Sequence, residues 1–217
     1  MNTFLSLFSS SIPLLADGAM GTLLHAQGVE HTRCFDELNV TDPGRVVAIH
    51  RQYIEAGAQI ILTNTFGANR YKLRKHGLEA QLDAINRAGV EIARRVVAES
   101  GKPVFVAGDI GPLGVRIAPY GRVQPMEARE AFLEQARALA AAGVDLFVIE
   151  TMTDLRETIE AIRAVRTFDG IPVVATMTFT RDDRTLLGDD PIKVAQVLAE
   201  AGADVIGVNC SSGPAQI

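Results

Sequence analysis

Cys210, Glu150 and Asp17 each stand at or just after the end of a short apolar run, in GVNC, LFVIE and IPLLAD. A carboxylate in that position is costly to bury without a partner. A cysteine there can be a metal ligand or a nucleophile, although a lone cysteine more often packs as a small apolar residue. These three side chains are the first candidates for catalytic or binding residues. Whether they lie close together depends on the strands and helices that carry them.

A repeated phrase of eleven residues indicates how these side chains are held. It occurs as EAGAQIILTNT, AAGVDLFVIET and EAGADVIGVNC, over residues 55–65, 141–151 and 200–210. Each copy is typical of a helix end, a glycine that closes the helix in a left-handed conformation, an apolar strand buried on both faces, and a polar exit. The glycines are Gly57, Gly143 and Gly202.

The whole chain alternates strand-like and helix-like patterns. Strands are predicted to begin near residues 12, 58, 103, 145, 171 and 204, and amphipathic helices are predicted over 41–56, 78–100, 125–143, 154–168 and 190–202. In the first helix Asp42 is the expected N-cap and Pro43 lies in the first turn. This order is typical of an α/β protein built from βα repeats.

Two βα architectures fit six units: a doubly wound open sheet and a (β/α)8 TIM barrel. The glycine spacing in DGAMGT does not match the dinucleotide-binding fingerprint. Polar residues follow every predicted strand, which favours the barrel. We therefore expect one domain over residues 1–217, an incomplete barrel of about six βα units that lacks the last two.

In a TIM barrel the chemistry lies at the carboxyl ends of the strands. In the repeat alignment Asn64, Glu150 and Asn209 share one register, and Thr65, Thr151 and Cys210 share the next. Asp109 ends another predicted strand. Convergence of two carboxylates, several amides and hydroxyls and one thiol predicts a site for a small zwitterion or polyol. We expect Asn64, Thr65 and Asn209 to contact that ligand.

Composition excludes several other classes of function. The net charge is −5 and no stretch is dense in Lys or Arg, so nucleic acid is a poor partner. No apolar run is long enough for a membrane helix, and the amino terminus lacks the basic region of a signal peptide. Two cysteines make no disulfide framework, which favours a reducing cytoplasm.

The remaining polar features have plainer interpretations. The four histidines (His25, His31, His50 and His76) have no metal-ligand spacing and are expected to be surface or packing residues. Cys34 is expected to be structural. The Gly- and Pro-rich segment 108–121 is either an ordinary connection or a lid and docking surface, and loops at this face of a barrel favour the second.

Several of these segments together resemble the homocysteine S-methyltransferase domain. They are LLADGAMGT, CFDELNVTDPGRVVAIHRQYIEAGAQIILTNTFGANRYKL, AGDIGPLG, GVDLFVIETMTDLRE and GADVIGVNCSSGP. The resemblance covers nearly the whole chain. The RIAPYG segment is most similar to the bacterial branch in which this domain is fused to a methylenetetrahydrofolate reductase.

The resemblance implies a zinc ion held by three cysteines, of which Cys210 matches the first. The other two would form an adjacent pair after an eighth strand, beyond the end of this chain, so this form is expected to be inactive alone. It also implies that Asp17, Gly18, Ala19 and Glu150 hold the amino acid end of homocysteine. Cys210 would then be a ligand and not a nucleophile.

The function implied is zinc-dependent methyl transfer to the thiol of homocysteine, giving methionine. The methyl donor would be of the folate, cobalamin, sulfonium or betaine type. A non-catalytic remnant that binds an amino acid thiol, or has only a structural role, is the alternative. An unrelated barrel lyase or aldolase would need a lysine at a strand exit, and no predicted exit carries one.

Overall fold

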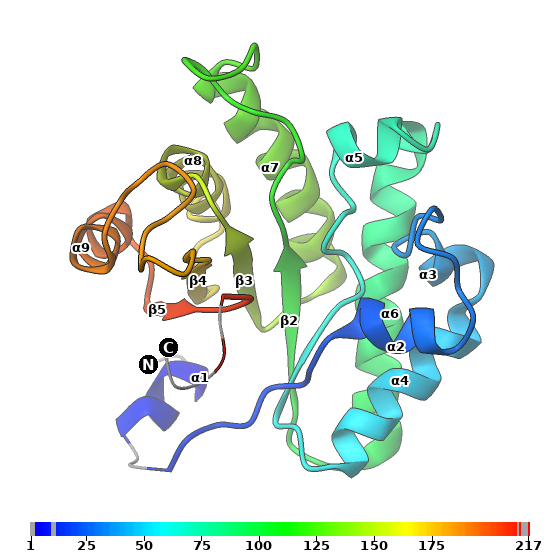
Figure 1. Ribbon diagram of the computed structural model, residues 1–217. Helices are drawn as coiled ribbons and strands as arrows, with labels where there is room; N and C mark the ends of the chain where they lie inside the picture. The colour runs from blue at the N-terminus through cyan, green and yellow to red at the C-terminus, as the bar shows by residue number, and fades with distance from the viewer. Residues whose placement is uncertain (1–2, 10–11, 212, 214–216) are drawn as a thin grey trace.

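Five parallel strands pair in the order in which they occur along the chain. They are β1 (Ile60–Leu62), β2 (Phe105–Ile110), β3 (Leu146–Met152), β4 (Val173–Met177) and β5 (Val205–Val208). The computed structural model describes residues 3–9, 12–211, 213 and 217. Because the strand order never reverses, the sheet has no switch point of the doubly wound kind. The barrel interpretation is therefore confirmed, with consecutive strands adjacent throughout (Figure 1).

The predicted first strand, residues 12–18, is wrong as an extended element. Ala16 makes a single parallel bridge to Ile60, and Asp17 N donates to Ile60 O at 2.9 Å. Pro13 has no N–H to give to a ladder, which keeps the pairing short. The segment nevertheless occupies the place of the first barrel strand, beside β1.

Helices cover the outer face of the sheet (Figure 1). The long ones are α4 (Pro43–Glu55), α6 (Leu82–Ser100), α7 (Pro125–Ala142), α8 (Leu155–Val165) and α9 (Pro191–Ala201). Shorter ones are α2 (Met20–Ala26), α3 (Leu38–Thr41), α5 (Arg70–Arg74) and the 3-10 turn η2 (Glu79–Gln81). The helices predicted from amphipathic pattern are all present, and the main apolar core lies between them and the strands.

The helix ends follow the expected chemistry with one exception. Gly57, Gly143 and Gly202 take positive φ angles of 106°, 91° and 102° at or just after their helices, as the repeat predicts. Asp42 stands at the N-cap of α4, but its side chain does not cap the helix. Its carboxylate instead accepts from Arg45 Nε at 2.6 Å.

The inner face of the sheet is filled from the amino-terminal end of the strands. There α1 (Thr3–Ser6), followed by the 3-10 turn η1 (Leu7–Ser9), places Phe4 against Ala107, Leu146 and Val148. Phe4 is 1% exposed and meets the Phe105 ring edge-on at 5.4 Å. The opposite, carboxyl end of the strands is left open for a site. No helix among the described residues is long and apolar enough to cross a membrane.

Candidate functional site

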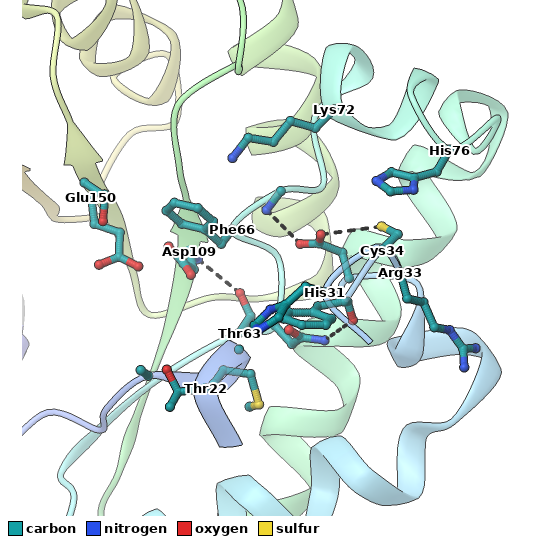
Figure 2. A pocket seen from close by; sticks show the side chains of 18 of the residues that line it. Thr22, His31, Arg33, Cys34, Thr63, Phe66, Lys72, His76, Asp109 and Glu150 are labelled. Atoms are coloured by element: carbon teal, nitrogen blue, oxygen red, sulfur yellow. Dashed lines mark hydrogen bonds between the residues drawn. The ribbon is translucent and has the colours of Figure 1, made fainter. Parts of the chain in front are cut away.

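A pocket of about 550 Å3 lies at the carboxyl ends of the strands. Its walls come from the segments that follow the Ala16 bridge, β1, β2, β3 and β5, and from α5, and Figure 2 shows most of the side chains. The polar lining residues are Thr22, His31, Arg33, Cys34, Asp36, Thr63, Asn64, Lys72, Lys75, His76, Asp109, Glu150, Thr151 and Cys210. Glu150 and Cys210, two of the three side chains expected to converge, therefore line one pocket, and Asp17 is not among its lining residues.

Asn209 organises the part of the pocket that contains the thiol. Its Nδ2 donates to Glu150 Oε2 at 2.7 Å and to Thr151 Oγ1 at 2.8 Å, and lies 3.5 Å from Cys210 Sγ. Its Oδ1 accepts from Thr151 N and from Thr176 Oγ1. The residue itself does not line the pocket; it orients Glu150, Thr151 and Cys210, which do.

The backbone at the strand exits is unusual. Thr151 and Cys210, matched in the repeat, both have positive φ, at 58° and 49°. Non-glycine residues in this region cost of order 1–3 kcal/mol and persist only where the surroundings fix them. The bond from Thr151 Oγ1 to Cys210 Sγ, at 3.5 Å, joins the two turns. The strained exits present Glu150 and the exposed Cys210 thiol to the same space.

The segment around Asp17 lies beside the pocket, although Asp17 and Gly18 themselves are not among the lining residues. Asp17 Oδ2 accepts from Leu62 N at 2.9 Å, while burial raises the pKa of this carboxyl to about 7. A Cβ at Gly18 would stand 2.9 Å from the Tyr53 hydroxyl, so a larger residue there would have to displace the Tyr53 side chain. Ala19, the next residue, lines the pocket and stands at the N-cap of α2.

Asn64 and Thr65 are placed differently from one another. Asn64 lines the pocket, but its Nδ2 donates to Phe35 O and to Asn39 Oδ1, which ties the exit of β1 to the segment before α3. Thr65 is fully buried behind the wall, where its hydroxyl donates to Asp109 O at 2.8 Å. Thr63, two residues earlier, reaches the pocket instead.

Lys72 is a pocket residue that the sequence patterns did not single out. Asn69 caps α5 by accepting from Tyr71 N and Lys72 N, and these bonds fix the position of the Lys72 backbone. Its Nζ lies 4.2 Å from the centre of the Phe66 ring, and Figure 2 shows the side chain extending into the pocket. Burial lowers its pKa, and the negative charges of Asp36 and Asp109 oppose that shift. The asparagine cap of α5, in the turn after β1, is the sequence signal that could have indicated Lys72 as a pocket residue.

Asp36 is a second such residue, deeply buried beside Lys72. Its Oδ1 accepts from Gly67 N at 2.7 Å, and its Oδ2 faces the Cys34 thiol at 3.6 Å. Burial raises the pKa of Asp36 and, at Cys34, raises the pKa of the thiol to about 11. Cys34 is therefore held as a neutral thiol, which agrees with a structural role although it borders the pocket.

The histidines divide into two groups. His50 is completely buried in α4, where burial lowers its pKa to about 4. His31 and His76 line the pocket, which the interpretation as surface or packing residues did not foresee. His31 stacks on His25 with ring centres 3.5 Å apart. Chain folding, and not spacing in the sequence, brings His31 and His76 to one pocket.

The segment after β2 is anchored to its neighbours. Pro112 O accepts from Asn69 Nδ2, Gly114 O accepts from Lys75 Nζ, and Leu113 N donates to Glu157 Oε1 at 2.7 Å. These bonds attach the start of the predicted lid segment to α5 and α8.

The donor atoms fit zinc only in part. Cys210 offers one exposed sulfur in the pocket, the kind of ligand zinc favours. Across residues 3–9, 12–211, 213 and 217, no three His, Cys, Asp or Glu side chains are arranged to hold a metal ion. Cys210 therefore fits as one member of a larger ligand set and does not make a metal centre with the side chains around it.

Comparison with known proteins decides the family. The family model for homocysteine S-methyltransferase matches residues 14–217. The chain belongs to the homocysteine S-methyltransferase family. Within this family it is 34% identical to methionine synthase of Mycobacterium tuberculosis and 33% identical to that of Mycobacterium leprae, over 94% of this chain in each case. It spans only 18% of the length of these two relatives.

A solved structure of the family has the same fold. The homocysteine methyltransferase MmuM of Escherichia coli, in its metallated form, superposes with a TM-score of 0.80 at 26% identity, covering 94% of this chain and 77% of MmuM. Its apo form gives a TM-score of 0.74 at 27% identity, covering 95% of this chain and 75% of MmuM. A more distant barrel, a phosphonomutase-like protein of Burkholderia cenocepacia, is similar in fold alone, at 18% identity and a TM-score of 0.52.

Proposed function

We propose that the pocket binds homocysteine and that the protein transfers a methyl group to its sulfur, producing methionine. The observation that carries this proposal is the arrangement of Glu150 and Cys210, held toward the same pocket by the single side chain of Asn209. A carboxylate suits the ammonium of an amino acid, and a thiolate-type metal ligand suits its sulfur. Membership of the homocysteine S-methyltransferase family supports the same assignment.

The binding of the amino acid end follows from the two walls. Glu150 and Asp17 would accept hydrogen bonds from the ammonium, and the backbone N–H groups of Gly18 and Ala19 would donate to the carboxylate. Thr63 and Asn64 lie along the same wall. Asn209 acts through Glu150 and Cys210 and is a positioning residue. Thr65 supports the wall from behind and would not contact the ligand.

The sulfur must be a thiolate to attack a methyl group. A free thiol has a pKa of about 8.5, so it is mostly protonated at neutral pH. Zinc, when bound, supplies the missing activation by stabilising the thiolate form of the substrate sulfur. We propose that Cys210 is one zinc ligand and that the other ligands come from outside the described residues. The new S–C bond forms as the donor's bond to the methyl carbon breaks, and the electron pair stays with the donor.

The proposed partners follow from this chemistry. Homocysteine is the acceptor, and the donor is of folate, cobalamin, sulfonium or betaine type. A reductase domain fused to this one in a longer protein would supply a folate donor. Both cysteines are free thiols, which supports a reducing cytoplasm as the place of action.

Calorimetric titration tests the substrate assignment. Homocysteine should bind the protein, and Glu150→Gln should weaken binding by about 10-fold or more, since a hydrogen bond to a charged group is worth about 1.5–3 kcal/mol. Glu130→Gln, an exposed site on α7, should bind as the parent does. If homocysteine does not bind, or if serine and methionine bind equally well, the substrate assignment is wrong.

Elemental analysis tests the metal assignment. Zinc is measured in this chain and in a version extended by two βα units, each with Cys210→Ala and Cys34→Ser variants. The extended protein should carry zinc that Cys210→Ala loses and Cys34→Ser keeps. Zinc that is unaffected by Cys210→Ala would refute the role of Cys210 and favour a packed strand-end thiol. An extended protein without zinc would favour the non-catalytic alternative.

A further inference from the structure

One carboxylate in the pocket has a buried oxygen without a partner. Asp109, near the end of β2, is 5% exposed and lines the pocket. Its Oδ1 is enclosed and accepts no hydrogen bond from any residue that the structure describes. A buried polar oxygen left unpaired costs about 1–3 kcal/mol, and more when the group is charged. Such an atom, in a residue that lines a pocket, calls for a donor that the described residues do not supply.

The main chain of Asp109 is fixed, so the side chain cannot move far to find a donor. Asp109 N donates to Thr63 Oγ1 at 3.0 Å, and its carbonyl accepts from Thr65 Oγ1 at 2.8 Å. The turn that follows is locked as well. Gly111 N donates to Phe66 O, and a Cβ at Gly111 would lie 2.4 Å from the Phe66 ring.

Asp36 shows what a satisfied carboxylate in this pocket looks like. It is as deeply buried as Asp109, but both of its oxygens have partners, at Gly67 N and Cys34 Sγ. Glu150 accepts from Asn209 through Oε2, and a side-chain hydrogen bond links Glu150 to Asp109. Asp109 therefore differs from Asp36 in having one enclosed oxygen, Oδ1, that no described residue satisfies.

The ligand group that fits is a primary ammonium. Glu150, on the adjacent strand β3, is the charged neighbour that acts most strongly on Asp109. The two carboxyl groups are hydrogen-bonded to one another, and a cation that enters the pocket would be attracted to the negative charge that they share. A divalent metal would need further ligands, which the described side chains do not provide. Lys72, which also lines the pocket, makes no ion pair with either carboxylate among the residues described.

We propose that Asp109 is a substrate-binding residue whose Oδ1 accepts a hydrogen bond from the ammonium group of the amino acid, beside Glu150. This rests on the proposed function and makes it more specific. The site would then select for a free amino group through carboxylates on two adjacent strands, and would discriminate against thiols that lack one. Figure 2 shows Asp109 between Glu150 and the segment that carries Thr63.

The test compares two ligands that differ only in the amino group. Homocysteine and 4-sulfanylbutanoate share the thiol and the carboxylate, and only the first has the ammonium. Calorimetric affinities are measured for the parent protein, for Asp109→Asn and for Asp36→Asn. Asp109→Asn should weaken homocysteine binding by about 10- to 100-fold and leave 4-sulfanylbutanoate within about twofold, because a charge-assisted hydrogen bond contributes about 1.5–3 kcal/mol.

The control separates a direct contact from damage to the pocket. Asp36→Asn removes an equally buried acid that is already satisfied, so it should change the two affinities by the same factor. Urea unfolding of each variant checks that the pocket is assembled. If Asp109→Asn also changes both affinities equally, or changes neither, the role of Asp109 is refuted. If the parent binds neither ligand, the proposed function fails before Asp109 is considered.

Discussion

Asn209 and Glu150 are joined by a hydrogen bond of 2.7 Å although their strands, β5 and β3, are not neighbours. The amide reaches across the end of β4, where Thr176 Oγ1 donates to Asn209 Oδ1 at 2.8 Å. Three consecutive strands are thereby tied at their carboxyl ends by one side chain. The geometry of the pocket at Cys210 depends on that tie.

Removing the Asn209 side chain should lower both the stability of the fold and the affinity for substrate. Asn209→Ala leaves Glu150 and Thr151 N without their partner, and we expect the free energy of unfolding to fall by about 1–3 kcal/mol. Thr176→Val removes a single bond to the same amide and should cost about 1 kcal/mol. Urea unfolding measures both. Equal losses in the two variants would contradict the role given to Asn209.

The charge of Lys72 should set the pH at which substrate binds. It lowers the pKa of Asp36, Asp109 and Glu150, each of which is raised by burial. Lys72→Met therefore raises these pKa values further and reduces the ionised fraction at neutral pH. Homocysteine binding, which needs ionised carboxylates, should then appear at higher pH.

Calorimetry from pH 5.5 to 8.5 measures this shift, which we expect to be on the order of one pH unit. Lys102→Met is the control, because Lys102 does not line the pocket and its Nζ donates to Ile54 O. It should leave the binding profile in place. A Lys72→Met profile that coincides with the parent's would show that this charge does not act on the binding carboxylates.

Glu157 should make the fold less stable as pH rises. Burial raises its pKa from an ordinary value of 4.5 to about 7, so the folded state holds the proton more tightly than the unfolded state. That contribution is fully present below pH 4.5 and is lost as pH rises through 7. Glu157→Gln, which can still accept from Leu113 N, should remove this loss, worth up to about 3 kcal/mol. Urea unfolding between pH 4 and 8 gives the comparison.

An exposed glutamate supplies the reference for that experiment. Glu130→Gln on α7 removes one acidic group without removing a buried one. Its stability should follow the same pH dependence as the parent protein. A flattened curve for Glu130→Gln, or an unchanged curve for Glu157→Gln, would mean that another group controls the effect.

Gly111 should not tolerate a larger side chain. A methyl group there would overlap the Phe66 ring and its carbonyl oxygen, at 2.4 Å and 2.6 Å, and overpacking of this kind costs about 1–3 kcal/mol. Gly44→Ala in α4 is the contrasting change, because the nearest atom is 3.9 Å away and alanine favours helix by up to about 1 kcal/mol. Thermal unfolding should lower the midpoint for the first variant and raise or preserve it for the second.

The repeat in the sequence predicted the strand exits well because local chemistry fixes them. A glycine that ends a helix, an apolar run and a polar residue need no distant partner to be recognised. The positions of Glu150, Asn209 and Cys210 followed from the repeat, and the polar residues at the predicted strand exits favoured a barrel over an open sheet. The segment 12–18 has the same apolar character, yet it makes only one bridge because pairing depends on its neighbour's register and on Pro13.

The other half of the pocket could not be predicted in this way. Lys72, Asp36 and His76 lie on short helices and turns, and they meet only because those elements fold back over the ends of β1 and β2. Their sequence surroundings resemble ordinary exposed loops. Asp109 was visible as a strand exit, but its unpaired oxygen is a property of the packed structure and has no sequence pattern.

Phe4 also has a consequence for how the chain is made. Its partners Leu146 and Val148 follow it by roughly 140 residues, and contacts so far apart in sequence form late. During synthesis on the ribosome, the first helix emerges long before the strands that will cover it. Its aromatic side chain cannot reach these partners until they have been made, so the inner face of the sheet is closed only after most of the chain exists.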